Sequence, residues 1–216
     1  NNLGSVLQAQ GDLEGAKKCF QRALAIDEKA LGPDHTSVAS IANNLGSVLQ
    51  AQGDLEGAKK CYQRALAIDE KALRPDHISV ARDVNNLGGV LQAQGDLEGA
   101  KKCFQRALAI DEKALGPEHT SVAIDVNNLG SVLQDQGNLE GAKICYQRAL
   151  AIDEKALGPE HTSVAIAVNN LGGVLKAQGD LEGARRCAER ARAIFEKRLG
   201  KDHPNSVLVS NNLRML

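Results

Sequence analysis

Cysteine and histidine are the residues of this chain whose side chains suit metal or redox chemistry, and both types recur at a fixed spacing. The cysteines are Cys19, Cys61, Cys103, Cys145 and Cys187, and the histidines are His35, His77, His119, His161 and His203. Within each set, every residue lies 42 positions after the one before it. In stacked repeats of that length, equivalent residues would lie roughly 10 Å apart, too far for a disulfide or for shared metal ligands. We therefore expect cysteines that fill the core, histidines that shape a loop, and no metal or other cofactor; a metal or redox sensor is the weaker alternative.

The residues that could support acid–base or nucleophilic catalysis form no evident set. No pair of Asp or Glu residues converges in the pattern, and no Ser stands beside a plausible general base. Glycine occurs in "LGSVLQ" and "LGGVLQ", but these segments lie within an expected helix and not between a strand and a helix, so a phosphate-binding loop is disfavoured. We expect a protein that is not an enzyme.

Paired asparagines open each copy of the segment "NNLG", at Asn1, Asn43, Asn85, Asn127 and Asn169. Asparagine costs a helix roughly 0.5 kcal/mol relative to alanine, so two in succession within a helix need an explanation. One interpretation is copying, because near-identical segments arise by recent duplication or by design. Another is a ladder of hydrogen bonds between repeats.

Composition restricts the fold and the partners. The 216 residues include no Trp, three Phe and two Tyr, so aliphatic side chains must supply most of the core. A net charge of −1 gives no broad positive field, which disfavours nucleic acid and membrane surfaces as partners. No apolar run approaches the roughly 18 residues that span a bilayer, and the first residues do not resemble a signal peptide. Together with unpaired cysteines, this predicts an intracellular, cytoplasmic location, and we interpret the chain as a piece of a longer protein.

Repetition is the dominant feature of the sequence. Residues 43–84 and 85–126 differ at only six of 42 positions, and a sixth copy begins at "NNLRML". A segment this short cannot bury its own apolar face, so the copies must stack on one another. We expect one repeat domain over 1–216, with units 1–42, 43–84, 85–126, 127–168 and 169–210 and a partial end helix over 205–216.

Each unit carries the signals of two helices. In the segment 36–52, apolar residues at Val38, Ala42, Leu45 and Leu49 recur at helical spacing. Glycine should end this first helix, helix A, and the aspartate that follows, such as Asp54, should cap the second, helix B. Helix B should bury the stripe Leu55, Ala58, Tyr62, Ala65, Ile68 and Ala72 and end near Leu73, before "LGPDH" or "LGPEH" closes most units. In these closures Gly32, Gly116 and Gly158 are predicted to be left-handed, whereas Arg74 breaks the pattern.

The order of small and aromatic residues resembles a known repeat family. The run Leu45, Gly46, Leu49, Gly53, Ala58, Tyr62, Ala65 is similar to the tetratricopeptide pattern, and the 42-residue period with "RALAIDEKALGPDH" is similar to the repeats of kinesin light chains. The usual unit has 34 residues and a closing proline, which Glu28, Glu70, Glu112 and Glu154 replace here, so helix B should be longer. The resemblance implies an all-α, right-handed superhelical solenoid of antiparallel helix pairs.

The resemblance also implies a function. In this family helix A lines a concave groove and the second asparagine of the pair grips the main chain of a bound peptide. Carried over to this sequence, the groove residues are Asn44, Asn86, Asn128, Asn170, Arg82, Gln50, Gln92, Gln134 and Lys176. Because most of these side chains are neutral, specificity for acidic peptides is not expected. We predict a non-catalytic protein- or peptide-binding scaffold of unknown ligand; the alternative is a structural spacer or self-assembling array, natural or designed.

The two ends of the array differ from its middle. In the fifth unit Ala188 replaces the aromatic residue, Arg192 and Arg198 replace apolar residues, and Phe195 replaces Asp, which we interpret as a wetter face beside an end helix. The first unit shows no such adaptation. We therefore expect exposed apolar surface at a truncated amino end, and self-association end to end through it.

Overall fold

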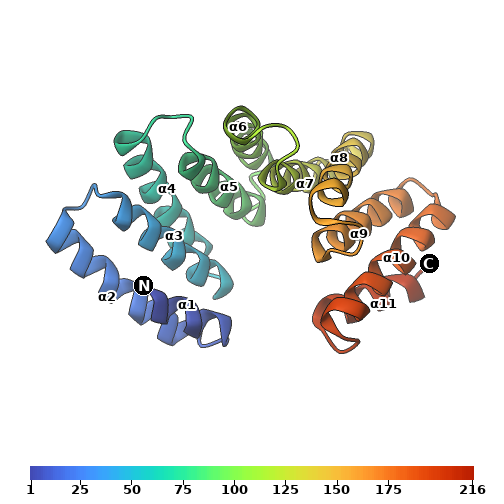
Figure 1. Cartoon of the computed structure of the whole chain (residues 1–216), viewed down its shortest axis with the longest axis horizontal. Coiled ribbons are helices and arrows are strands. Elements are labelled where there is room, and N and C mark those ends of the chain that lie inside the picture. The colour runs from blue at the N-terminus through green and yellow to red at the C-terminus, as the bar shows by residue number, and fades with distance from the viewer. The chain divides into compact units, whose positions relative to one another are not determined.

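The computed structural model describes residues 1–216 and contains eleven α-helices and no strand (Figure 1). Their bounds are α1 Asn2–Ala9, α2 Leu13–Leu31, α3 Thr36–Ala51, α4 Leu55–Ala72, α5 Ile78–Ala93, α6 Leu97–Leu115, α7 Thr120–Asp135, α8 Leu139–Leu157, α9 Thr162–Ala177, α10 Leu181–Leu199 and α11 Pro204–Arg214. The odd-numbered helices up to α9 are the A helices and the even-numbered ones the B helices of five successive repeats. The all-helical class and the pairing of consecutive helices are confirmed.

The chain divides into two compact parts, residues 1–110 and residues 111–216, which are described separately. In the first part, α4 packs against α3 of its own repeat and against α5 of the next. In the second part, α8 makes the same two contacts with α7 and α9, and α10 packs against α9 and α11. Each part therefore shows the nearest-neighbour stacking that the repeat predicts. One domain over the full chain remains a prediction.

Side chains that the sequence places at helix starts cap those starts. The Asp54 carboxylate accepts a hydrogen bond from the amide of Gly57 at 2.9 Å, as predicted, and Asp12 caps α2 in the same way. Histidine caps the A helices: Nδ1 of His35 accepts from the amide of Ser37 and Nδ1 of His161 from that of Ser163. The loop-shaping role expected of the histidines thus has a physical form, because each satisfies a backbone donor that the helix leaves free.

Glycine ends the helices, with one correction to the expected geometry. Gly53, after α3, has a φ of 82°, and Gly32, after α2, has a φ of 90°. The ψ of Gly32 is 158°, however, so this residue is in an extended region open to glycine alone and not in the left-handed helical region that we expected. Arg74 takes no positive φ, because α4 ends one residue early and Leu73 is extended.

The core of each of the first four repeats is a glycine of helix A packed under an aromatic ring of helix B, whereas Gly172 of the fifth repeat faces Cys187. A Cβ on Gly46 would lie 2.7 Å from Cε1 of Tyr62, and one on Gly130 would lie 2.9 Å from the same atom of Tyr146. The predicted helix A stripe is buried throughout, as is most of the helix B stripe; Ala72 is exposed, which the sequence pattern did not predict. The glycine–aromatic contact fixes how closely the two helices approach.

In the fifth repeat our interpretation of a wetter face is wrong for two of the four substitutions. Ala188 is buried, and Phe195 is buried against Val209 of α11. The preceding repeats have an aspartate at the position of Phe195. Phenylalanine suits the fifth repeat because the end helix α11 packs apolar side chains against it. Arg192 is half-buried and Arg198 is exposed.

Ion pairs join successive B helices. Glu28, Glu70, Glu112 and Glu154, which stand where the family has a closing proline, each accept from an arginine one repeat later: Arg64, Arg106, Arg148 and Arg190. Both partners are partly exposed in every pair, so each contributes at most about 1 kcal/mol. The longer helix B therefore adds a polar contact between neighbours.

Two adjacent glycines of α5 provide a matched test of the close contact. A Cβ on Gly88 would lie 2.8 Å from Cε1 of the buried Phe104, whereas one on Gly89 would meet nothing nearer than 4.0 Å. We expect Gly88→Ala to lower the free energy of unfolding by about 2 kcal/mol through overpacking. Gly89→Ala should raise it by up to about 1 kcal/mol through helix propensity. Urea unfolding of both variants measures the difference, and equal stabilities would contradict the proposed constraint.

Candidate functional site

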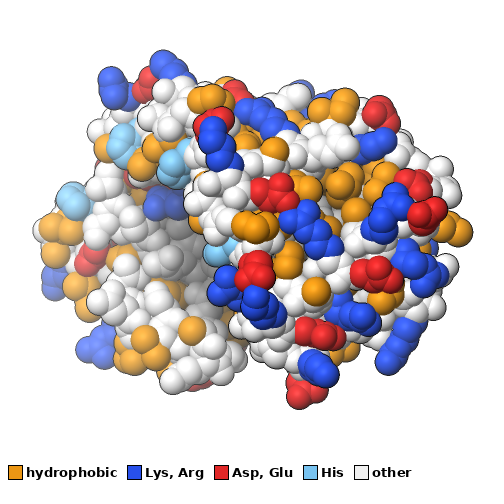
Figure 2. All heavy atoms as spheres, turned by 45° about the vertical axis from the view of Figure 1, so that its right-hand side comes forward, with side chains coloured by type: hydrophobic (Ala, Val, Ile, Leu, Met, Phe, Trp, Pro, Cys, Tyr) orange, Lys and Arg blue, Asp and Glu red, His pale blue; other side chains and the backbone are white.

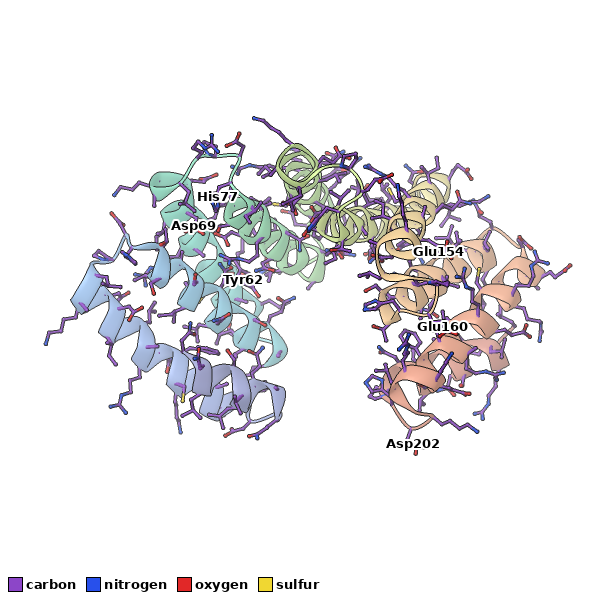
Figure 3. The ribbon with its side chains drawn as sticks, in the orientation of Figure 1. Tyr62, Asp69, His77, Glu154, Glu160 and Asp202 are labelled. Atoms are coloured by element: carbon purple, nitrogen blue, oxygen red, sulfur yellow. The ribbon has the colours of Figure 1, made fainter.

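An open polar pocket lies on the A helices of the first part. It has a volume of about 410 Å³ and is lined by Ser40, Asn43, Asn44, Ser47, Tyr62, Arg82 and Asn86. The lining comes from α3 and α5 together with Tyr62 of α4, which is labelled in Figure 3. Three of the predicted groove residues, Asn44, Arg82 and Asn86, are thus brought together. Tyr62 is an addition that we had assigned only to the core.

The asparagines form hydrogen bonds from one repeat to the next. Nδ2 of Asn86 donates to Oδ1 of Asn43 at 3.2 Å, and Nδ2 of Asn170 donates to Oδ1 of Asn127 at 3.0 Å. Asn212 donates likewise to Asn169, and Asn44 to Asn1. In each of these bonds the second asparagine of one pair reaches the first asparagine of the preceding pair. The ladder that we considered is therefore present, while Asn44, Asn86 and Asn170 remain half-buried.

The glutamines of helix A pair with the phenols of helix B. The hydroxyl of Tyr62 donates to Oε1 of Gln50 at 3.2 Å, and that of Tyr146 donates to Gln134 at 3.1 Å. Burial raises the pKa of both phenols to about 12, so they stay protonated and able to donate. Of the other predicted groove residues, Gln92 and Asn128 are half-buried on α5 and α7. Lys176 is exposed on α9 and donates to the carbonyl oxygen of Met215.

Arg82 does not present a free positive charge to the pocket. Its guanidinium donates to Oδ1 of Asp83 at 3.0 Å and lies 3.5 Å from Oδ2 of Asp69. Both carboxylates are buried, and Asp83 also accepts from Asn43 at 2.6 Å. Burial raises the pKa of Asp83 to about 6 in spite of the arginine beside it. Sequence reasoning missed these carboxylates because Asp is rarely buried without a partner, and the partner comes from the next repeat.

The second part holds a related pair of acids. Asp125 of α7 and Asp111 of α6 are both buried and interact with each other, and Ile124 stands where the preceding repeat has Arg82. Burial, with Asp111 adding to it, raises the pKa of Asp125 to about 8. One acid of the pair therefore holds a proton at neutral pH and can share it with the other.

The cysteines and histidines form no metal centre. No group of three or more His, Cys, Asp or Glu side chains lies close enough to hold an ion. Burial raises the pKa of the thiols of Cys61, Cys103, Cys145 and Cys187, which lowers their reactivity.

Charges are mixed over the surface. On the face shown in Figure 2, Lys and Arg side chains alternate with Asp and Glu, and hydrophobic side chains lie between them. No helix has the length and apolar character needed to cross a bilayer. The local surface thus shows no broad patch of one sign.

Comparison with known proteins identifies the repeats. The model of the family described as tetratricopeptide repeat matches residues 1–71, 37–113, 80–155, 121–197 and 163–213. These ranges together cover nearly the whole chain. The chain belongs to the tetratricopeptide repeat family. No curated protein matches it in sequence.

Among solved structures, this tetratricopeptide array is similar to kinesin-light-chain-like repeat proteins. A putative kinesin light chain of Podosopora anserina with nearly identical TPR-like repeats is 27% identical, with 92% of this chain and 94% of that chain covered and a TM-score of 0.74. A point variant of that protein is 26% identical, covers 91% and 92%, and has a TM-score of 0.76. BtubC (BKLC) from P. vanneervenii is 26% identical, covers 94% and 80%, and has a TM-score of 0.78. The predicted resemblance is confirmed.

The buried acids make the stability of these repeats depend on pH. The pKa of Asp125 rises from an ordinary 3.8 to about 8 on folding, so the folded state binds more protons between those values. The contribution of Asp125 to the free energy of unfolding is fully present below about pH 4 and is lost as pH rises through about 8. Asp125→Asn keeps a donor for Asp111 without the charge. We expect it to raise the free energy of unfolding at pH 8 by on the order of 2 kcal/mol and to flatten its dependence on pH.

Thermal unfolding followed by circular dichroism from about pH 5 to pH 8.5 measures this effect. Asp202→Asn, which changes an exposed aspartate of the same part, is the matched control and should leave the pH profile unchanged. A profile of Asp125→Asn that parallels that of the unsubstituted protein would contradict the assignment.

Proposed function

We propose that this tetratricopeptide array is a non-catalytic scaffold that binds an extended protein or peptide segment along its A helices. The observation that carries the proposal is the pocket of about 410 Å³ whose lining includes Asn43, Asn44 and Asn86. Paired amides at an open pocket suit the N–H and C=O groups that every peptide main chain offers. On α3 and α5 of the first part, Gln50 and Gln92 would add to this surface. In the second part, the predicted residues of α7 and α9 would form a surface of the same kind: Asn128, Gln134, Asn170 and Lys176.

The ladder leaves the amide of Asn86 with unused hydrogen-bonding capacity. An Asn side chain has two N–H donors and a carbonyl oxygen with two lone pairs. Asn86 donates once, to Asn43, and is only half-buried. A ligand main chain can therefore bind the remaining donor and acceptor while the ladder holds the side chain in one orientation. Such pre-orientation lowers the entropic cost of binding.

The charge around the pocket favours a neutral segment. The guanidinium of Arg82 is already countered by Asp69 and Asp83, so little positive charge remains for an acidic ligand. Ser40, Ser47 and Tyr62 add hydroxyl groups to the lining. We infer main-chain recognition with polar, uncharged side-chain contacts at this pocket.

A structural spacer or self-assembling array is the second candidate function. It is favoured by the same ladder, because each rung uses amide groups to join repeats. Leu3 and Val6 of α1 are 63% and 51% exposed, which supports association through that end. Free cysteines support a reducing, cytoplasmic location for either function.

A peptide library tests the pocket directly. We expect random extended peptides selected on the unsubstituted protein to lose at least about tenfold in affinity for the double variant Asn44→Ala/Asn86→Ala, because two amide contacts are lost. The double variant also loses the hydrogen bond from Asn86 to Asn43 and the one from Asn44 to Asn1, so its melting temperature should fall. Binding must therefore be compared at a temperature well below the melting temperature of the variant. Titration calorimetry of selected peptides measures the affinities.

Arg64→Ala is the matched control, because it removes an ion pair to Glu28 on the B helices and leaves the pocket unchanged. It should bind the selected peptides as the unsubstituted protein does. If no peptide is enriched, or if the double variant changes stability and no binding, the spacer function is the better account.

A further inference from the structure

One position of helix B occurs five times in the array with different surroundings. The equivalent residues at this position are Asp27, Asp69, Asp111, Asp153 and Phe195. Fourteen residues after each of them, on the next A helix, stands a second variable residue: Ile41, Asp83, Asp125, Ala167 and Val209. The residue immediately before this second residue also varies between repeats: it is Ser40, Arg82, Ile124, Ile166 and Leu208 in turn. Because the frame repeats almost unchanged, the five copies show what different side chains do at one place in the fold.

In the first part, the chain itself supplies a cation to this aspartate. The guanidinium of Arg82 lies 3.5 Å from Oδ2 of Asp69 and also forms an ion pair with Asp83. The side chain of Asp69 is 2% exposed, yet that of Arg82 is 47% exposed. A guanidinium arriving from the A helix side thus reaches a buried carboxylate.

In the second part, the equivalent aspartate lines a pocket. Asp153 is 7% exposed. In place of the first part's arginine and aspartate stand Ile166 and Ala167, which bring no cation to the carboxylate. The result is a pocket of about 190 Å³ lined by Ala123, Ile124, Asn127, Asp153, Ser163, Ile166 and Ala167. Burial raises the pKa of Asp153, with the nearby His161 opposing the shift, as expected of an acid that has lost water without gaining a close counter-ion.

We propose that this pocket binds the guanidinium of an arginine side chain from a protein or peptide ligand, with Asp153 as its counter-ion. The proposal rests on the proposed function, since the arginine belongs to a segment that crosses the A helices. It adds selectivity for an arginine in the ligand, whereas the contacts proposed for the first part recognise the main chain and not a particular side chain.

The lining fits an arginine side chain from stem to head. Ile124 and Ile166 are 57% and 42% exposed at the pocket and can cover the methylene stem. The planar head can donate two parallel hydrogen bonds to the Asp153 carboxylate. Asn127 and Ser163 offer further acceptor oxygens, although Asn127 already accepts one hydrogen bond from Asn170. A lysine would place a single point charge there and leave more of the pocket unfilled.

Capped amino acids test the pocket without a full ligand. We expect N-acetyl-L-arginine amide to shift the NMR signals of Asp153, Ile124 and Ile166 with a Kd of about 1 mM, and we choose a pH above neutral for the titration because the pKa of Asp153 is raised. The matched probe N-acetyl-L-citrulline amide has nearly the same shape without the charge, and should bind at least about tenfold more weakly.

Two variants of the chain provide independent controls. Asp153→Asn removes the counter-ion, and Ile166→Arg places an internal guanidinium where Arg82 stands in the first part, which should fill the site. Each should weaken binding of the arginine probe at least about tenfold while the variant retains its helical circular dichroism. Ile166 is 42% exposed, so the second variant should fold even if the first does not.

Three results would overturn the proposal: equal binding of the citrulline probe, unchanged binding by Ile166→Arg, or no shift at the pocket residues with the arginine probe. None of these would affect the peptide experiment with Asn44 and Asn86, which tests a different pocket in the first part. The opposite outcome is also distinguishable. If the library yields no peptide but the arginine probe binds, the guanidinium site stands and the proposed peptide-binding function of the first part is contradicted.

Discussion

The close approach of helix A to helix B at the glycine–aromatic contact is the constraint on which the first four repeats depend. A methyl group on Gly46, Gly88 or Gly130 would lie under 3 Å from the facing ring, so no other residue leaves room for that ring. Because the ring holds helix A at one depth and rotation, the opposite side of helix A is fixed as well. The ring itself reaches the pocket, because Tyr62 is part of the lining and its hydroxyl donates to Gln50. The position of the pocket therefore follows from packing beneath it.

Contacts between repeats are of a different kind from those within a repeat. Within a repeat the helices meet through apolar side chains, whereas neighbouring repeats add amide ladders on the A helices and ion pairs on the B helices. Exposed ion pairs contribute little, but a half-buried hydrogen bond is costly to leave unmade. The ladder consequently fixes the register of stacking and, at the same time, orients amides at the pocket. The ladder by itself gives asparagine a role at a position where alanine would make a better helix, and the binding that we propose would use the same side chains.

Much of the local structure could be predicted from the sequence because it depends on near neighbours in the chain. Helix bounds, the Asp54 cap and the buried stripe of α3 follow from short-range patterns that the repeat states several times over. Contacts across repeats could not be read in this way. The pairing of Arg82 with Asp69, the Tyr62 phenol on Gln50 and the burial of Phe195 all depend on which residue a different helix places opposite. A periodic pattern says which face of a helix is buried, but it does not say which polar groups meet there.

The near identity of the repeats separates the residues that maintain the frame from those that set local chemistry. Exchanging Arg82 for Ile124 while the aspartate is kept converts the arginine-paired acids Asp69 and Asp83 into the acid pair Asp111 and Asp125, which holds a proton. The next change, to Ile166 and Ala167, leaves a carboxylate at Asp153 beside an open pocket, and the last, to Leu208 and Val209, accompanies an apolar end at Phe195. These changes leave the paired asparagines in place, but Asp83 accepts a hydrogen bond from Asn43, so in the first part this variable position is joined to the ladder. Charge, protonation and cavity shape therefore vary from repeat to repeat on one frame, at positions that share their pockets with the asparagines: Arg82 with Asn43, and Ile124 with Asn127.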